Sequence, residues 1–306
     1  MPSSRPLFLA LTLLLPASLP AHPDHTVTQK GVVEAVPSTQ EPSTKNQVSI
    51  TIEGDKRVIT ANGIPDHATG RFPNADNPNR ITAQRYRYTI PLKPVPAARP
   101  VPLVRQPFGI ALNGVVFDPG TAEAWQNKRD SGWSYDALGG AFSLGLDTNH
   151  GHVQPTGAYH YHGIPAALLA RLSGDQARPT LVGWAADGFP IYAKWDLRDP
   201  QDKTSPVIAM RASYRLKKGE RPTTNGQPGG TYDGVFVEDF EYVAGSGDLD
   251  ECSGRFGPTP EFPEGVYHYV LTEDFPFIPR NVRATPDPSF ASRGPPPGGG
   301  SGGPGA

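Results

Sequence analysis

The sequence has one cysteine, Cys252, among its 306 residues. A single cysteine cannot form a disulfide within the chain, so stability must come from a hydrophobic core, from a bound metal or from both. Long apolar runs are lacking as well. The run from Leu7 to Leu15 is much shorter than the roughly 20 residues that cross a bilayer, and no later stretch approaches that length. We therefore expect no membrane span once the N-terminal segment is removed.

An excess of charge of one sign is also absent, because 28 Lys and Arg stand against 30 Asp and Glu. Such a balance offers no polyanion-binding surface and argues against nucleic acid as a partner. Long helices are not expected either, because 36 Pro and 34 Gly interrupt the chain. The composition favours many turns and short strands.

Local patterns predict a mainly β fold, a sandwich-like or irregular multi-stranded domain with one or two short helices and long loops. Apolar and polar residues alternate over residues 48–53 and 86–90, which is typical of half-buried strands. Asn113-Gly114 lies between apolar runs and predicts a hairpin with a type I′ turn. Residues 165–172 predict a short helix, with Gly174 just beyond its end.

Composition divides the chain into four parts. Residues 1–21 combine a short basic start, an apolar run and a small-residue exit, the pattern of a secretory signal peptide. Residues 22–46 are polar and are expected to form a flexible lead-in. Residues 47–285 are expected to form the β domain, and residues 286–306 a disordered tail rich in Gly and Pro. We expect an exported protein, periplasmic or secreted.

Four of the eight histidines lie within thirteen positions, as the pairs His150-Gly151-His152 and His160-Tyr161-His162. Residues i and i+2 of a strand point to the same face, so each pair directs two imidazoles one way. Imidazole nitrogens suit transition metals, and we predict that His150, His152, His160 and His162 bind one ion, copper or zinc. The alternative is that these histidines only form hydrogen bonds on a sheet surface.

A segment similar to the histidine-rich stretch occurs later in the chain. Residues 146–152 (LDTNHGH) align with residues 249–255 (LDECSGR), and residues 157–162 (GAYHYH) align with residues 265–270 (GVYHYV). The domain could therefore consist of two related halves. The second copy keeps one histidine of the four, so a second, equivalent metal site is not expected. It could still donate a ligand to the first site, the candidates being Asp250, Cys252 and His268.

Calcium is the weaker choice of metal. Asp147 and Asn149 offer oxygen atoms two residues apart near a glycine, as do Asp248 and Asp250, but neither pair has the spacing of an EF-hand loop. Asp147 and Asn149 could instead accept hydrogen bonds from imidazole N–H groups and fix which nitrogen faces the metal.

Evidence for catalysis is thin. The sequence has no Gly-x-Ser-x-Gly elbow, no Gly-rich phosphate loop and no His-Glu-x-x-His helix. A metal with an open position could activate water, and the weak candidates for acid–base groups are Asp187, Glu251 and Tyr161. Asp187 is also explained as an ordinary turn residue before Gly188.

At Gly157-Ala-Tyr-His-Tyr-His162 the sequence resembles the YHYH-domain family of exported proteins, which is named for that tetrapeptide. The resemblance extends from about residue 62 to about residue 280 and includes Asn113-Gly114, residues 187–192 and residues 249–254. It implies an extracytoplasmic domain in which His160 and His162 belong to the naming motif. It implies no catalytic roles.

Three functions follow from these patterns. The first is metal handling, or metal-dependent surface chemistry, by an exported metal-binding protein. The second is a metal-dependent hydrolase or oxidase that acts on an envelope or extracellular polymer. The third is a binding module for a glycan or peptide, in which tryptophans contact the ligand instead of the core; the candidates are Trp125, Trp133, Trp184 and Trp195. The sequence does not identify the small molecule or polymer that such a protein would bind.

Overall fold

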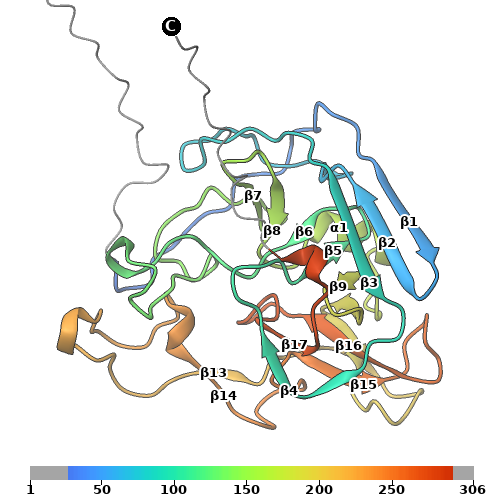
Figure 1. Ribbon diagram of the computed structural model, residues 1–306. Helices are drawn as coiled ribbons and strands as arrows, with labels where there is room; N and C mark the ends of the chain where they lie inside the picture. The colour runs from blue at the N-terminus through green and yellow to red at the C-terminus, as the bar shows by residue number, and fades with distance from the viewer. Residues whose placement is uncertain (1–26, 292–306) are drawn as a thin grey trace, which may run out of the picture.

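The structure is a computed structural model that describes residues 27–291 (Figure 1). The expected signal peptide, the start of the lead-in and residues 292–306 of the expected tail lie outside the described residues. Within residues 27–291 the fold is mainly β, with several sheets and one α-helix, which confirms the predicted fold class. None of the helices in this part of the chain is long and apolar enough to cross a membrane.

The main sheet has eight strands in the order β15-β16-β10-β9-β5-β6-β8-β7. Their side chains are largely buried because other elements cover both faces. The strands are β5 (Gly109–Ala111), β6 (Val116–Phe117), β7 (Gly151–Val153), β8 (Tyr159–Tyr161), β9 (Leu181–Ala185), β10 (Pro190–Ala193), β15 (Gly254–Gly257) and β16 (Val266–Leu271).

The two halves of this strand order correspond to each other. From the centre outwards, β5, β6, β8 and β7 match β9, β10, β16 and β15, and the strands pair in the same way. β5 and β9 run antiparallel at the centre, with Gly109 opposite Ala185 and Ala111 opposite Gly183. Each then turns back into its hairpin partner, β6 or β10. β6 pairs in parallel with β8, and β10 pairs in parallel with β16. The sheet therefore consists of two similar four-stranded halves, related by an approximate two-fold axis between β5 and β9.

The two central hairpins turn in the same way. The N–H of Ala111 donates to Val115 at 2.8 Å, and the N–H of Ala185 donates to Phe189 at 2.9 Å. Only the glycine of each turn has a positive φ, 80° at Gly114 and 102° at Gly188. A type I′ turn needs two such residues. The hairpin was therefore predicted correctly at Asn113-Gly114 but its turn type was wrong, because the loop has three residues and needs positive φ at its last.

Four smaller sheets surround the main one. A three-stranded sheet lies along one side (right in Figure 1), and a two-stranded sheet projects at the lower left. The first is β1 (Val48–Glu53), β2 (Lys56–Ala61) and β3 (Tyr86–Pro91); the projecting one is β13 (Tyr214–Leu216) and β14 (Phe240–Tyr242); the others are β4 (Pro96–Pro102) with β17 (Asn281–Ala284), and β11 (Trp195–Leu197) with β12 (Val207–Ala209).

The α-helix, α1 (Ala166–Ser173), lies where the sequence predicted it. Leu168 anchors it in the main core, and Gly174 ends it in the left-handed conformation with φ of 63°. Single-turn 3₁₀ helices complete the fold: η1 (Trp125–Asn127), η2 (Thr224–Gly226), η3 (Val237–Asp239) and η4 (Pro288–Phe290).

Three outer segments differ from expectation. Residues 286–291, the start of the expected disordered tail, pack on the domain, where Phe290 of η4 is buried and stacks on Tyr88. β1 is exposed on both faces, because it is the edge strand of its sheet and only β2 and β3 reach the core. The described part of the lead-in is hydrogen-bonded to the domain: the N–H of Val36 donates to Leu146, and the N–H of Thr148 donates to Val36. Residues 27–46 thus lie beside the loop that carries the first histidines.

Candidate metal centre

A hairpin made of β7 and β8 positions the histidines. Its register places His152 directly opposite His160. His162 follows two residues after His160 and points to the same face, whereas Tyr159 and Tyr161 point to the opposite face and into the core. The period-two pattern of the sequence therefore determines which side chains meet.

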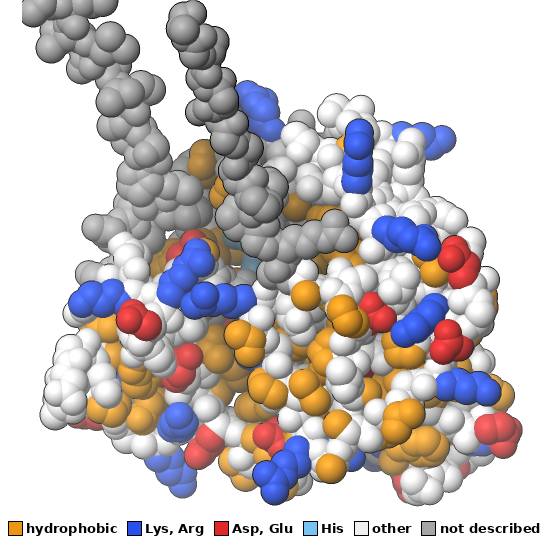
Figure 2. All heavy atoms as spheres, in the orientation of Figure 1, with side chains coloured by type: hydrophobic (Ala, Val, Ile, Leu, Met, Phe, Trp, Pro, Cys, Tyr) orange, Lys and Arg blue, Asp and Glu red, His pale blue; other side chains and the backbone are white. Residues whose placement is uncertain are grey.

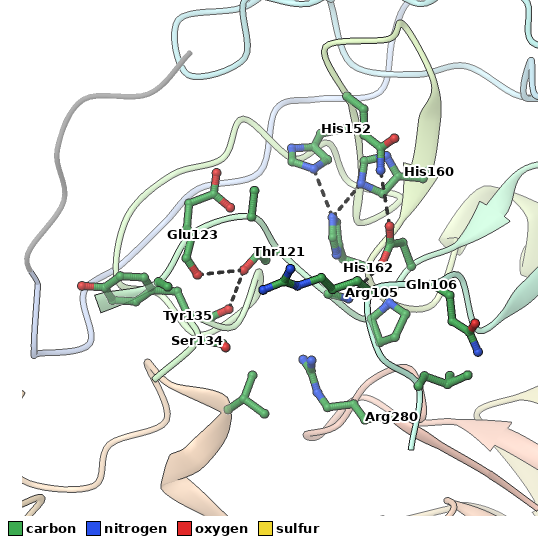
Figure 3. Close-up of a pocket in the computed structure, with 18 of the residues that line it drawn as sticks. Arg105, Gln106, Thr121, Glu123, Ser134, Tyr135, His152, His160, His162 and Arg280 are labelled. Carbon is green, nitrogen blue, oxygen red and sulfur yellow. Dashed lines mark hydrogen bonds between the residues drawn. The ribbon is translucent and has the colours of Figure 1, made fainter. Parts of the chain in front are cut away.

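Three imidazoles converge at one point (Figure 3). Nε2 of His162 lies 2.9 Å from Nε2 of His160 and 3.0 Å from Nε2 of His152. All three rings are buried, with 4%, 3% and 9% of their surface exposed in that order. No other group of three His, Cys, Asp or Glu residues with metal-ligand spacing occurs in the described part of the chain.

Backbone carbonyls determine which nitrogen of each ring carries the proton. Nδ1 of His152 lies 2.9 Å from the carbonyl of Leu144, and Nδ1 of His160 lies 3.2 Å from the carbonyl of Ala158. A carbonyl can only accept, so both Nδ1 atoms carry hydrogen and both Nε2 atoms present lone pairs. The single Nε2 hydrogen available on His162 can satisfy only one of them.

A cation at the centre satisfies all three Nε2 lone pairs at once. Three nitrogens bound tetrahedrally at the usual zinc distance of about 2.0–2.1 Å lie about 3.3 Å apart. The observed 2.9 and 3.0 Å need an opening of only a few tenths of an ångström. Nδ1 of His162 has no hydrogen-bond partner of good geometry among the described residues. The cluster could bind a metal.

The rings are in the protonation state that a metal requires. Burial lowers the pKa of His160 to about 4. Burial also holds the pKa of His162 well below its ordinary value, with further lowering by the neighbouring charges of His160 and His152. Both imidazoles are therefore neutral at neutral pH, and a metal need not displace a proton from them.

The histidines form the floor of an open cleft with a volume of about 910 Å³. All three protein nitrogens approach from the floor, so a bound ion would keep an open coordination position toward the cleft. The walls come from segments far apart in sequence and include Arg105, Asp118, Thr121, Glu123, Tyr135 and Arg280 (Figure 3).

The structure does not bring His150 to this cluster. It precedes β7 in a turn with φ of 54°, so the alternation that aligns His152 with its strand does not extend back to it. Its Nδ1 faces the carbonyl of Ile164 at 2.8 Å, and its ring lines a different cavity, near α1. The site thus contains three of the four predicted histidines, His152, His160 and His162.

Asp147 and Asn149 are scaffold residues and do not touch the imidazoles of the cluster. Asp147 is fully buried, and its carboxylate accepts from the N–H groups of Gly70, Asn149 and Gly151 and from the Tyr159 hydroxyl. This saturation with donors also leaves no oxygen for calcium. The interpretation of Asp147 and Asn149 as acceptors for imidazole N–H was wrong, because backbone carbonyls have that role.

The candidates from the second half lie at the position equivalent to the metal centre, not in it. β15 and β16 pair like β7 and β8, with Arg255 opposite His268. Nε2 of His268 contacts Asp196 at 3.0 Å, and the Arg255 guanidinium lies 3.7 Å from the same carboxylate. The second half thus has a partly buried arginine where the first has His152.

The remaining second-half candidates have structural roles. Asp250 accepts from the N–H groups of Cys252 and Gly254 and from the Tyr267 hydroxyl, which repeats the pattern of Asp147. Cys252 is buried, and burial raises the pKa of its thiol to about 12. It is therefore an inert core residue and no ligand of the three-histidine cluster.

None of the weak catalytic candidates reaches the cleft. Tyr161 is buried behind β8, where its hydroxyl accepts from Asn113 and contacts His67 at 2.6 Å. Asp187 is fully buried in the turn between β9 and β10 and accepts from the Tyr269 hydroxyl. Glu251 is exposed on the loop before β15. These residues do not act on a substrate beside the metal centre.

Sequence reasoning missed several residues of the site. Asn77 donates to the carbonyl of Val153, and its amide nitrogen lies 3.2 Å from Nδ1 of His152, beside the hydrogen bond of that nitrogen to Leu144. Arg105, Asp118 and Arg280 line the cleft but come from loops with no motif. The only available signal was the dense run of Asn residues around position 77.

The four tryptophans do not form a binding surface. Trp133 is buried and Trp125 packs against the same small cluster, and Trp125 also donates to the carbonyl of Gly226. Trp184 packs in the core beneath the Arg57 guanidinium, and Trp195 lies under Lys194. This placement removes the observation that favoured a glycan or peptide module.

The fold and the site define a mainly β protein with a buried three-histidine cluster that could hold a metal. A family model described as YHYH protein matches residues 87–284, which is most of the chain, and the chain belongs to this family. The matched region contains both halves of the main sheet and all three histidines. No curated protein matches the chain, and no solved structure matches it.

Proposed function

We propose that the protein is an exported metal-binding protein that holds one transition-metal ion, copper or zinc, through Nε2 of His152, His160 and His162. The observation that carries the proposal is the convergence of three buried imidazoles: Nε2 of His162 lies 2.9 Å from that of His160 and 3.0 Å from that of His152, and backbone carbonyls orient two of the rings. Export rests on the N-terminal signal-like sequence.

The comparison between the halves of the main sheet supports the proposal. Backbone pairing is common to both halves, as is the Asp that accepts from the first tyrosine of β8 or β16, so these features belong to the shared scaffold. His152 and His162 occur in one half only, where Arg255 and Val270 stand in the other. Histidines that folding does not require, gathered around one point, are explained by a ligand.

A second candidate function is metal-dependent catalysis. The open cleft above the histidines favours it, because three protein ligands and one open position are typical of catalytic zinc sites, whereas structural zinc sites are closed. The polymer-degrading reaction considered from the sequence requires a substrate chain in this cleft. Turnover by metal-loaded protein that vanishes with the metal would favour this alternative over metal handling.

Metal content measured on purified protein tests the proposal. The wild type, offered Zn²⁺ or Cu²⁺ and then dialysed, should retain one equivalent by elemental analysis. His162→Ala should lower the affinity by at least about 100-fold, because even the loss of outer-sphere partners costs 10- to 100-fold. The matched controls are His150→Ala and His268→Ala, which remove nearby histidines outside the cluster and should leave the stoichiometry at one.

Two results would contradict the proposal. One is a wild-type protein that retains no stoichiometric metal although it is folded. The other is a His162→Ala variant that binds as tightly as the wild type. Circular dichroism of every variant establishes that a loss of metal is not a loss of fold.

A further inference from the structure

The cleft above the histidines has more positive than negative side chains. Its lining contains three arginines and two acidic residues, an excess of one positive charge; they are Arg105, Arg129, Arg280, Asp118 and Glu123. A divalent ion in the three-histidine cluster would add two more. On the molecular surface, Lys and Arg side chains gather beside this hollow, on the centre left of Figure 2.

Arg280 is fixed in place at the wall of the cleft. Its guanidinium donates to the buried carboxylate of Asp136 at 2.5 Å and lies 5.3 Å above the Phe275 ring. Only 22% of its side chain is exposed. A guanidinium held in this way is pre-organised for a ligand.

Arg105 approaches from another segment. Its backbone is in the left-handed region with φ of 52°, a conformation that costs about 1 kcal/mol for a residue with a side chain. In the close-up, the Arg105 side chain passes in front of His162 and extends toward Thr121, and the Arg280 side chain rises toward it from below (Figure 3). Two cationic side chains therefore face the space that the open metal position also faces.

The two acidic residues of the lining lie beside this space, and Asp136 behind Arg280 is a third carboxylate. Asp118 is half-buried. Its oxygens accept from the N–H of Gly120 at 3.0 Å and from the Gln154 side chain at 3.3 Å. Glu123 lies at the far side of Thr121 from the histidines in the close-up (Figure 3).

From this arrangement we propose that the metal centre binds an oxyanion, a carboxylate or phosphate group of a small molecule, which occupies the open metal position and is held on its other side by Arg105 and Arg280. The proposal rests on the proposed function. Guanidinium groups match the two oxygens of a carboxylate or phosphate, and the same anion can donate an oxygen to a metal.

Cobalt-loaded protein tests the proposal, because Co²⁺ occupies zinc-type sites and its visible spectrum reports its ligands. Metal content and affinity are measured first. Inorganic phosphate and acetate are then titrated separately into the Co²⁺ protein. We expect a saturable spectral change with at least one anion, and the stronger of the two identifies the class of oxyanion.

The arginine variants decide where the anion lies. Arg105→Gln should weaken anion binding by about 10- to 100-fold, the effect of losing one charge-assisted hydrogen bond, while Co²⁺ affinity stays unchanged or rises. Arg280→Lys keeps the charge that Asp136 requires and should weaken binding through loss of the planar fork. Arg87→Gln, at an exposed position of β3, is the matched control and should change nothing.

The possible failures are distinguishable. A folded wild type that binds no Co²⁺ overturns the proposed function and this inference together. A Co²⁺ protein whose spectrum ignores both anions up to tens of millimolar overturns the inference alone, as does a spectral change of equal affinity in the wild type and in Arg105→Gln.

Discussion

The Tyr159 hydroxyl donates a hydrogen bond to Asp147 at 2.8 Å, across the loop that precedes the histidine-bearing hairpin. Tyr267 and Asp250 form the same bond at 3.0 Å in the other half of the sheet. In both halves a Cβ on the glycine that starts the hairpin, Gly151 or Gly254, would collide with that tyrosine hydroxyl. The β7–β8 hairpin is therefore fixed from its core side, opposite the face that presents the histidines.

Removal of the Asp147 carboxylate should destabilise the whole protein. Asp147→Ala leaves the Tyr159 hydroxyl and three backbone N–H groups without their acceptor in a fully buried place. We expect the free energy of unfolding to fall by at least about 3 kcal/mol. Urea unfolding of metal-free protein measures it, with Asp76→Ala at an exposed position as the control. A loss below about 1 kcal/mol would show that water replaces these bonds.

The second half should become a metal site when its missing ligands are supplied. Arg255→His with Val270→His places imidazoles opposite His268 and two residues beyond it, which repeats the geometry of the first half. Elemental analysis of the folded double variant should find two equivalents of metal where the wild type has one. Arg255→His alone, with two histidines in that half, should remain at one equivalent. A double variant that stays at one would show that the halves differ in more than these ligands.

Asp187 should make stability depend on pH between about 4 and 6. Burial raises its pKa from 3.8 to about 6, so the folded protein keeps a proton that the unfolded chain releases. Its contribution is complete below pH 4 and decreases as pH rises to 6, by up to about 3 kcal/mol. Asp187→Asn removes this titration. Unfolding free energies measured at pH 4 and pH 6 should therefore fall more for the wild type than for the variant, and equal changes would refute the assignment.

Cys252 should be unreactive while the protein is folded. The thiol is buried and its pKa is raised to about 12, so almost no thiolate exists at pH 8. A thiol reagent such as a disulfide dye should react stoichiometrically only after unfolding in urea. Cys252→Ala should keep the metal stoichiometry of the wild type. Rapid labelling of the native protein, or loss of metal in the variant, would contradict this assignment.

The fold class and three of the site's histidines could be predicted because they depend on local patterns. Alternation along a strand fixed the common direction of His160 and His162, and the Asn113-Gly114 pair located a hairpin. The error at His150 has a local cause too. Its positive φ breaks the alternation, and a histidine gives little sign in sequence of adopting that conformation.

The rest of the site depends on contacts between distant segments, which one sequence does not reveal. Asn77 contacts His152, which is 75 residues away in the sequence, and Arg280 contacts Asp136, which is 144 residues away. The duplication was visible only where it keeps identical residues, at 146–162 and 249–270. The equivalent hairpins turn at Asn113-Gly114 and Asp187-Gly188, which have only the glycine in common. Their equivalence is visible only in the strand pairing.

Because the main sheet consists of two similar halves, each half can serve as an internal control for the other. His160 and His268 occupy equivalent positions on equivalent strands, yet only one lies in the candidate site. His268 pairs with the Asp196 carboxylate, whereas His160 faces another imidazole. The same substitution made in turn at both places, in metal-loaded and in metal-free protein, therefore separates the structural role of this strand position from its role as a ligand.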